Sequence, residues 1–128
     1  MTDPATPPVH PRRRFPARLY DSGSEPDPRF TLANERTFLA WLRTSLALIA
    51  AGVALEVLAA GIQPGLRLAA ALLLAVSGLV APFQAWFGWY LAERAMRLQR
   101  PLPSPVLALP LTAAVVAAGV LIVIGLLV

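Results

Sequence analysis

The chain has 128 residues, of which 57% are hydrophobic and only 14% are charged, and its formal net charge is +4. A soluble domain of this size cannot bury so much apolar surface, so the composition predicts an integral membrane protein. Every basic residue is an arginine near an apolar run, a placement typical of topology signals and contacts with anionic lipids and not of nucleic-acid binding. The chain has no cysteine and only one histidine, His10, so no disulfide or Cys/His metal site is expected.

Residues 1–26 are rich in proline and poor in apolar side chains, which predicts a disordered cytoplasmic tail. The tail contains the basic cluster Arg12–Arg14. Contact with anionic lipids is one interpretation, and a solvated tail whose charge only orients the chain is the other, which we favour. Residues 27–128 are predicted to form a membrane domain with three helices, at about 28–61, 66–97 and 105–128.

The first helix is the most unusual part of the sequence. It begins with an N-capping aspartate, Asp27, followed by proline at the first helical position. Arg29, Arg36 and Arg43 recur every seven residues, so they fall on nearly one side of the helix, which we call the arginine face. Arginine in a membrane-length helix is costly and usually functional. Four small residues continue this face and predict a contact with protein: Ala47, Ala50, Ala51 and Ala54.

The second helix contains Pro82, which is expected to free a backbone carbonyl, and Gln84, which needs a hydrogen-bond partner. Glu56, near the end of the first helix, has two open interpretations, a buried functional carboxylate and one that reaches the membrane surface. Aromatic residues near the arginines are predicted to anchor the helices at the membrane interface; they are Phe38, Trp41, Trp86, Trp89 and Tyr90.

The distribution of arginines predicts a cytoplasmic N-terminus and an outside C-terminus, because the tail and the second connector carry nearly all of them. No nucleophile–histidine pair, phosphate-binding glycine loop or carboxylate pair is recognisable, so we expect no enzymatic activity and no cofactor. The remaining chemistry is a set of cations near two carboxylates and an amide: Arg29, Arg36, Arg43, Arg94 and Arg97 with Glu35, Glu93 and Asn34.

Guanidinium groups favour phosphate and carboxylate, so this set fits an anionic ligand or lipid head group, an anion path, or internal salt bridges to Glu35 and Glu93. Three helices offer too little interior to shield Arg43 and line a pore as well. A homo-oligomer with the first helix facing inward would satisfy both needs, and we expect one.

The run LANERTFLAWLRTSLALIAAG, residues 32–52, closely resembles the signature of the YidH-like family of small bacterial inner-membrane proteins with three spans. The domain is also similar to the membrane part of the eukaryotic vacuolar transporter chaperone, which makes polyphosphate and passes it across a membrane. This second resemblance implies that Arg36, in the NERTFL motif, and Arg29, seven residues earlier, face a polyphosphate-like anion.

Two functions follow as hypotheses. The first is a multi-pass inner-membrane protein, homo-oligomeric, whose arginine face meets a phosphate-like anion. The alternative is a structural or accessory membrane subunit whose arginines make salt bridges and lipid head-group contacts.

Overall fold

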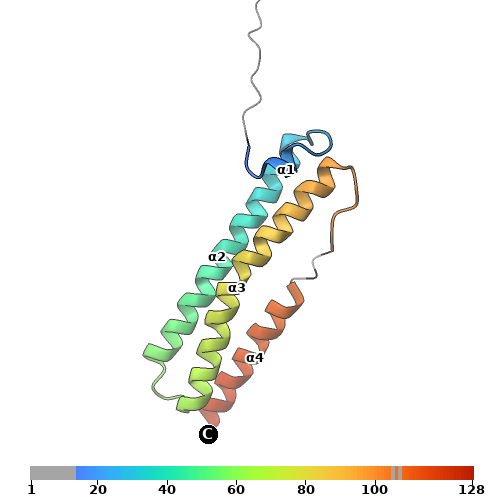
Figure 1. Cartoon of the computed structure of the whole chain (residues 1–128). Coiled ribbons are helices and arrows are strands. Elements are labelled where there is room, and N and C mark those ends of the chain that lie inside the picture. The colour runs from blue at the N-terminus through green and yellow to red at the C-terminus, as the bar shows by residue number, and fades with distance from the viewer. Residues whose placement is uncertain (1–13, 105, 107) are drawn as a thin grey trace, which may run out of the picture.

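A computed structural model describes residues 14–104, 106 and 108–128, and that part of the chain forms four helices (Figure 1). The last three are each long and apolar enough to cross a membrane. The predicted all-α class with three membrane-length helices is therefore confirmed, whereas the side on which each terminus lies stays a prediction. The helices are α1 (Ala17–Tyr20), α2 (Pro28–Leu58), α3 (Pro64–Arg97) and α4 (Ala108–Leu127).

α2 and α3 begin with the same two features, a capping side chain and a proline at the start of the helix. The Asp27 carboxylate accepts a hydrogen bond from the Arg29 amide at 2.9 Å. The Gln63 side chain accepts one from the Leu66 amide at 2.7 Å. α2 then continues without a break, so its polar beginning and its apolar span form a single rod.

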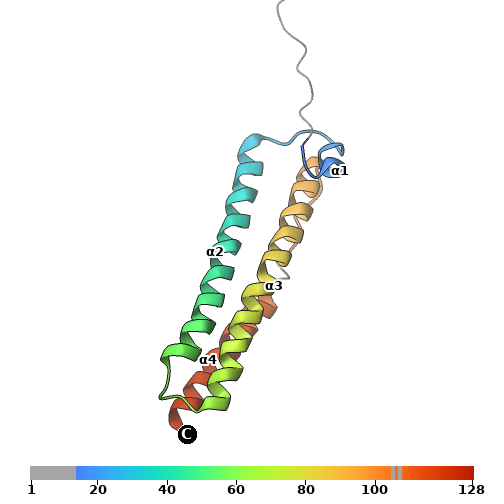
Figure 2. The same cartoon turned by 60° about the vertical axis from the view of Figure 1, so that its left-hand side comes forward.

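α3 lies in the middle of the molecule, with α2 and α4 packed against it (Figures 1 and 2). Within the described residues, no Cα atom of α2 comes within 8 Å of a Cα atom of α4. The C-terminal end of α4 returns to the α2–α3 turn, where the Gln63 amide donates a hydrogen bond to the Gly125 carbonyl at 2.9 Å. A small apolar core joins the three helices; its buried members are Leu48, Ala70, Leu74 and Ala118.

Small residues set the distance between α2 and α3. A Cβ atom added to Gly78 would lie 2.7 Å from both Ile49 Cγ1 and the Ser45 carbonyl oxygen. A Cβ atom added to Gly52 would lie 2.6 Å from the Ala71 carbonyl oxygen. Neither position has room for a side chain, so these two glycines allow the helix backbones to approach closely.

Pro82 leaves a gap in the hydrogen bonding of α3, and α2 fills it. Because proline lacks an N–H group, the carbonyl of Gly78, four residues earlier, has no donor within the helix. The buried Ser45 hydroxyl of α2 donates a hydrogen bond to this carbonyl. The sequence predicts the freed carbonyl, and the structure identifies the side chain that satisfies it.

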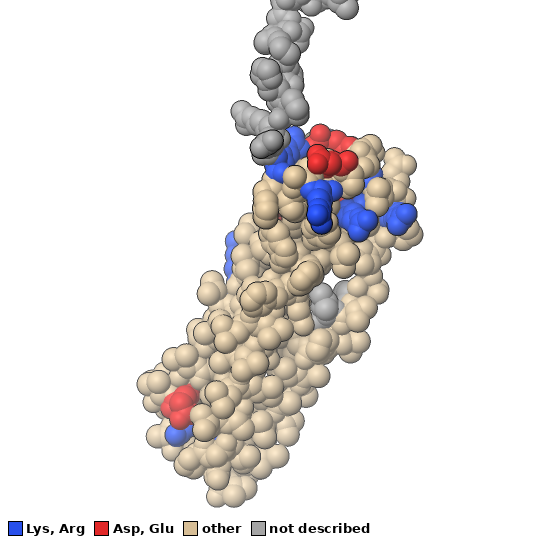
Figure 3. All heavy atoms as spheres, in the orientation of Figure 1, with Lys and Arg blue, Asp and Glu red and all other residues tan. Residues whose placement is uncertain are grey.

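On the face shown in Figure 3, most charged side chains lie at the two ends of the molecule, and the surface between them is mostly apolar apart from one basic patch at the left edge. At the α2–α3 turn, Glu56 and Arg67 form an ion pair, with Nε–Oε2 and Nη2–Oε1 distances of 3.3 Å. The Glu56 side chain is 41% exposed. In the single chain Glu56 is thus neither buried nor unpaired, and both interpretations of its role stay predictions.

Residues 14–26, the described part of the tail that the sequence predicts to be disordered, include α1 and contact the end of α3. Leu19 of α1 is fully buried, and the Tyr20 ring lies over the Arg97 guanidinium, with Cζ 4.5 Å from the ring centroid. The Ser24 amide also donates a hydrogen bond to the Arg97 carbonyl at 3.1 Å. The tail as a whole has few apolar side chains, but two of them, Leu19 and Tyr20, pack at the end of α3. Residues 1–13 of the predicted tail lie outside the described residues.

Candidate functional site

The arginine face lies on the side of α2 that points away from α3. Ser45, which contacts α3, follows Arg36 by nine residues, or two and a half helical turns, so the two residues are on opposite sides of the helix. Arg29, Arg36 and Arg43 are all exposed. None of the three forms an ion pair within the described part of the chain, in contrast to Arg14, Arg67 and Arg97.

The alanines that continue the arginine face are also uncovered. Ala47, Ala50, Ala51 and Ala54 are exposed in the single chain. The expected contact of this stripe with protein is therefore not made by α3 or α4, because α3 packs against the opposite side of α2. Within the described residues, the alanine stripe is therefore left uncovered.

The carboxylate of Glu93 is fully buried at the centre of a polar cluster between α2 and α3. The Thr31 hydroxyl donates a hydrogen bond to Glu93 Oε1 at 3.1 Å, and Asn34 Nδ2 donates to Oε2 at 3.4 Å. Asn34 Nδ2 also donates to the Trp89 carbonyl oxygen at 3.1 Å. One turn along α3, Arg97 Nε lies 3.5 Å from Glu93 Oε1. These contacts occupy Glu93, so it is not the partner of the arginine face.

Arg97 is buried under residues 14–26, which we call the α1 segment. Tyr20 covers its guanidinium group, and Arg97 Nη2 lies 3.9 Å from Glu25 Oε1. Its Nε atom is buried and has no hydrogen-bond partner within the described residues. The predicted supporting residues therefore separate: Asn34, Glu93 and Arg97 form an internal cluster, whereas Glu35 and Arg94 are exposed.

Glu25 also accepts a hydrogen bond from Arg14, with which it forms an ion pair. This hydrogen bond, together with the positive charge of Arg14, lowers the pKa of the Glu25 carboxyl and raises the pKa of the Arg14 guanidinium. Both groups are exposed and lie before the first membrane-length helix. The α1 segment therefore carries its own charge pair beside the buried Arg97.

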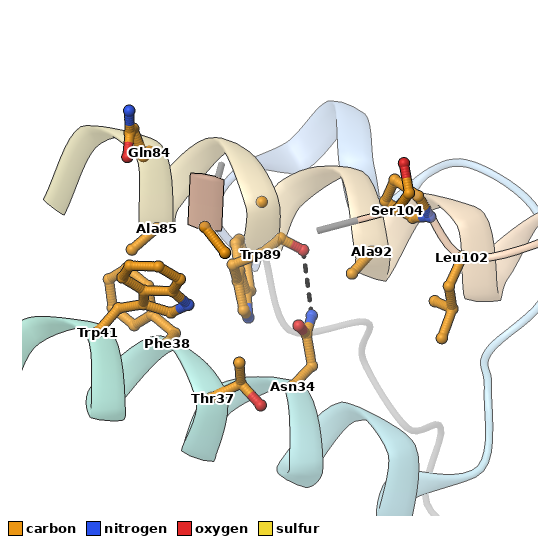
Figure 4. A pocket seen from close by; sticks show the side chains of 13 residues that line it. Asn34, Thr37, Phe38, Trp41, Gln84, Ala85, Trp89, Ala92, Leu102 and Ser104 are labelled. Atoms are coloured by element: carbon orange, nitrogen blue, oxygen red, sulfur yellow. Dashed lines mark hydrogen bonds between the residues drawn. The ribbon is translucent and has the colours of Figure 1, made fainter. Parts of the chain in front are cut away.

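Three of the predicted aromatic anchors, Phe38, Trp41 and Trp89, surround a cavity of about 230 Å³ between α2, α3 and the α3–α4 connector (Figure 4). Trp86 contacts Phe38 edge to face, with ring centroids 6.2 Å apart, and Trp89 at 5.2 Å. Tyr90 is half-buried. The role of these residues as membrane anchors stays a prediction. The structure adds that the rings of Phe38, Trp41, Trp86 and Trp89 pack between or beside the helices. Polar groups in the cavity wall come from Asn34, Thr37, Gln84 and Ser104.

Sequence reasoning missed Thr31 and Tyr20, which complete the cluster around Glu93 and Arg97. A signal for Thr31 is present, because Thr31 and Asn34 are three residues apart and so share the side of α2 opposite to Arg36. Tyr20 gives no such signal, because its partner Arg97 is the last residue of α3. The two residues are far apart in the sequence and meet only when the chain folds.

The family described as a domain of unknown function, DUF202, matches residues 29–95. The uncharacterized protein Rv2272 of Mycobacterium tuberculosis is 50% identical over 80 residues, which cover 62% of this chain and 66% of that protein, just under two thirds of its length. The inner membrane protein YidH of Escherichia coli (strain K12) is 51% identical over 83 residues, which cover 63% of this chain and 71% of that protein.

No solved structure matches the chain. The matched region, residues 29–95, includes the whole arginine face and the Glu93 cluster except Arg97 and the α1 segment. The resemblance to the vacuolar transporter chaperone stays a prediction, whereas the resemblance to YidH-like proteins is confirmed: this chain belongs to the DUF202 family of YidH-like proteins and is a multi-pass protein of the bacterial inner membrane.

Proposed function

We propose that this chain assembles as a homo-oligomer in which the arginine face of α2 binds phosphate-like anions and lines a path for them. The observation that carries this proposal is that Arg29, Arg36 and Arg43 are exposed together and form no ion pair in the described residues. The competing explanation was internal salt bridges to Glu35 and Glu93. Arg97 and Asn34 already contact Glu93, and the exposed Glu35 forms no ion pair within the described residues. Guanidinium groups left without carboxylates favour bidentate contacts with phosphate oxygens.

The depth of Arg43 supports the oligomer. Arg43 follows Trp41 by two residues and precedes the end of α2, Leu58, by 15 residues, which is about 22 Å of helix. A hydrocarbon layer is ~30 Å thick. If Leu58 marks its far boundary, Arg43 lies within the layer, about 8 Å from the nearer boundary. A lipid-exposed arginine at this depth is costly, whereas a second copy against the alanine stripe would remove the arginine from lipid.

The anion test uses the full chain in nanodiscs of neutral phosphatidylcholine, with tripolyphosphate as the probe and calorimetry as the readout. Replacing Arg36 by glutamine should weaken binding about tenfold, because one charge-assisted contact is worth roughly 1.5 kcal/mol. Arg18→Gln is the matched control, since Arg18 is exposed but lies outside the arginine face. Equal losses for the two variants, or no loss for Arg36→Gln, would contradict an anion site on this face.

The oligomer test exploits the absence of natural cysteine. A single Ala54→Cys variant should form a disulfide-linked dimer in native membranes, because Ala54 lies on the same side of α2 as Arg36. Leu72→Cys, at an exposed position of α3, is the control and should remain largely monomeric. A monomer for both variants would count against the proposed assembly.

The second candidate is an accessory subunit whose arginines serve only structure and lipid contact. The Glu56–Arg67 and Glu93–Arg97 pairs favour it, because they show that other arginines of this chain do serve structure. Arg36→Glu separates the two candidates. Loss of tripolyphosphate binding with crosslinking at Ala54→Cys intact supports the anion site, whereas loss of crosslinking as well supports the accessory subunit.

A further inference from the structure

The C-terminal end of α3 folds back and places two arginines beside each other. Gln99 adopts a left-handed conformation, with φ of 53°, and the Arg100 amide donates a hydrogen bond to the Ala95 carbonyl at 2.9 Å. This turn ends the helix and reverses the chain direction. Arg100 and Arg94 consequently line one hollow of about 270 Å³ between the end of α3 and the connector.

Both arginines of this hollow are available to a ligand. Arg94 and Arg100 are exposed, and neither forms an ion pair within the described residues. The nearest carboxylate in sequence, Glu93, is buried in the cluster against α2 and does not line the hollow. The partial negative charge at a helix C-terminus, equivalent to about half an elementary charge, is smaller than the two positive charges that the arginines supply.

The rest of the wall is apolar and belongs to the outer side of α3. Leu91 and Leu98 line the hollow, and they are seven residues apart, so they share one side of the helix. Leu91 precedes the buried Glu93 by two residues, which turns it about 200° away from α2. Leu91 is 49% exposed. Leu91 therefore continues the apolar wall from the two guanidinium groups toward the middle of α3, on the side of the helix that points away from α2.

The level of the hollow suits a lipid phosphate. Tyr90 ends the aromatic segment of α3 that is predicted to lie at the head groups, and Arg94 follows it by four residues, or about 6 Å of helix. We propose that the hollow binds the phosphate of one anionic phospholipid, with Arg94 and Arg100 on the phosphate oxygens and an acyl chain along Leu91. This site lies on α3 and is separate from the arginine face of α2, so either proposal can fail alone.

The test is lipid retention by the full chain in native mass spectrometry, after exchange from detergent into phosphatidylglycerol or phosphatidylcholine. An arginine near the membrane surface contributes ~1 kcal/mol to contact with anionic lipid. The apparent affinity for phosphatidylglycerol should therefore fall about 5-fold for Arg94→Gln or Arg100→Gln and about 25-fold for both together. Retention of phosphatidylcholine and the thermal unfolding curve should be unchanged, since both side chains are exposed.

The matched control is Arg18→Gln, which removes one exposed arginine that lies outside both the hollow and the arginine face and is compared with each single variant. An equal loss of phosphatidylglycerol in this control would overturn the site, because the effect would then be one of general charge. An unchanged Arg94→Gln/Arg100→Gln variant would overturn it as well. If millimolar inorganic phosphate displaces the lipid, the two arginines bind a soluble phosphate, and the proposed phospholipid site is refuted. If the glutamine variants unfold, the lysine variants, which keep the charge, should retain the lipid, and their failure to do so also refutes the proposal.

Discussion

The hydrogen bond from Ser45 to the Gly78 carbonyl makes a quantitative prediction about the α2–α3 contact. Ser45 is 3% exposed, and Ser45→Ala removes the hydroxyl with little change in volume. The Gly78 carbonyl then has no donor, because Pro82 cannot supply one. Hydrogen bonds between membrane helices are worth ~0.6 kcal/mol on average and at most ~1.7 kcal/mol. We expect a cost near the upper value, since the carbonyl is buried and has no second donor in the described residues.

The double-mutant cycle isolates this effect. Pro82→Ala restores an N–H group four residues after Gly78, so the carbonyl regains a donor within α3. In that background Ser45→Ala should cost less by about 1 kcal/mol, and this difference is the coupling energy. The free energy of unfolding can be measured by steric trapping in micelles or bicelles. An equal cost of Ser45→Ala in both backgrounds would refute the reasoning, because Ser45 would then act through packing alone.

Three further predictions concern other contacts. Gly78→Ala should destabilise the protein by about 1–3 kcal/mol, because the added Cβ would lie 2.7 Å from Ile49 Cγ1. Gly88→Ala, whose added Cβ would have no atom within 4 Å, should be neutral or slightly stabilising in the same unfolding assay. Glu93→Ala should cost about 3–5 kcal/mol because it leaves Arg97 buried without its ion-pair partner, whereas the exposed Glu35→Ala should change the unfolding free energy by less than about 0.5 kcal/mol. The lowered pKa of Glu25 means that its ion pair with Arg14, which links the two ends of residues 14–26, is present above the ordinary carboxyl pKa of 4.5 and is lost as the pH falls through the lowered value. A spin label at Ser24→Cys should therefore become slightly more mobile in acid, and the same label in a Glu25→Gln variant should lose this pH dependence.

The arginine spacing, the helix start at Asp27 and the three spans follow from local chemistry, so they could be predicted from the sequence. The direction in which the arginine face points could not. α2 carries small residues on two opposite sides, Ser45 with Gly52 on one and the alanines on the other, and each side alone would suit a close helix contact. Packing against α3 selects the first, because Gly78 and its freed carbonyl lie there.

The charge partners were hidden for a related reason. Glu56–Arg67 crosses a turn, Glu93–Arg97 is covered by residues from two other segments, and the α1 segment docks on a helix end more than 70 residues later in the chain. Such pairs depend on the rotation of each helix about its axis, which the hydrophobic pattern of an almost wholly apolar helix leaves undetermined.

The bond between the Gln63 amide and the Gly125 carbonyl has a mechanical consequence for α4. It fastens α4 at the Gly125 end, Ala118 packs into the core midway along the helix, and Ala108 at the other end borders the cavity beside Trp41. From Gly125 to Ala108 the helix is a lever of 17 residues, about 26 Å long. A rotation of about 5° at the fastened end moves Ala108 by roughly 2 Å, the size of a methyl group, by the same helix geometry. A rigid tilt of α4 about its fastened end would therefore change the width of the cavity beside Trp41.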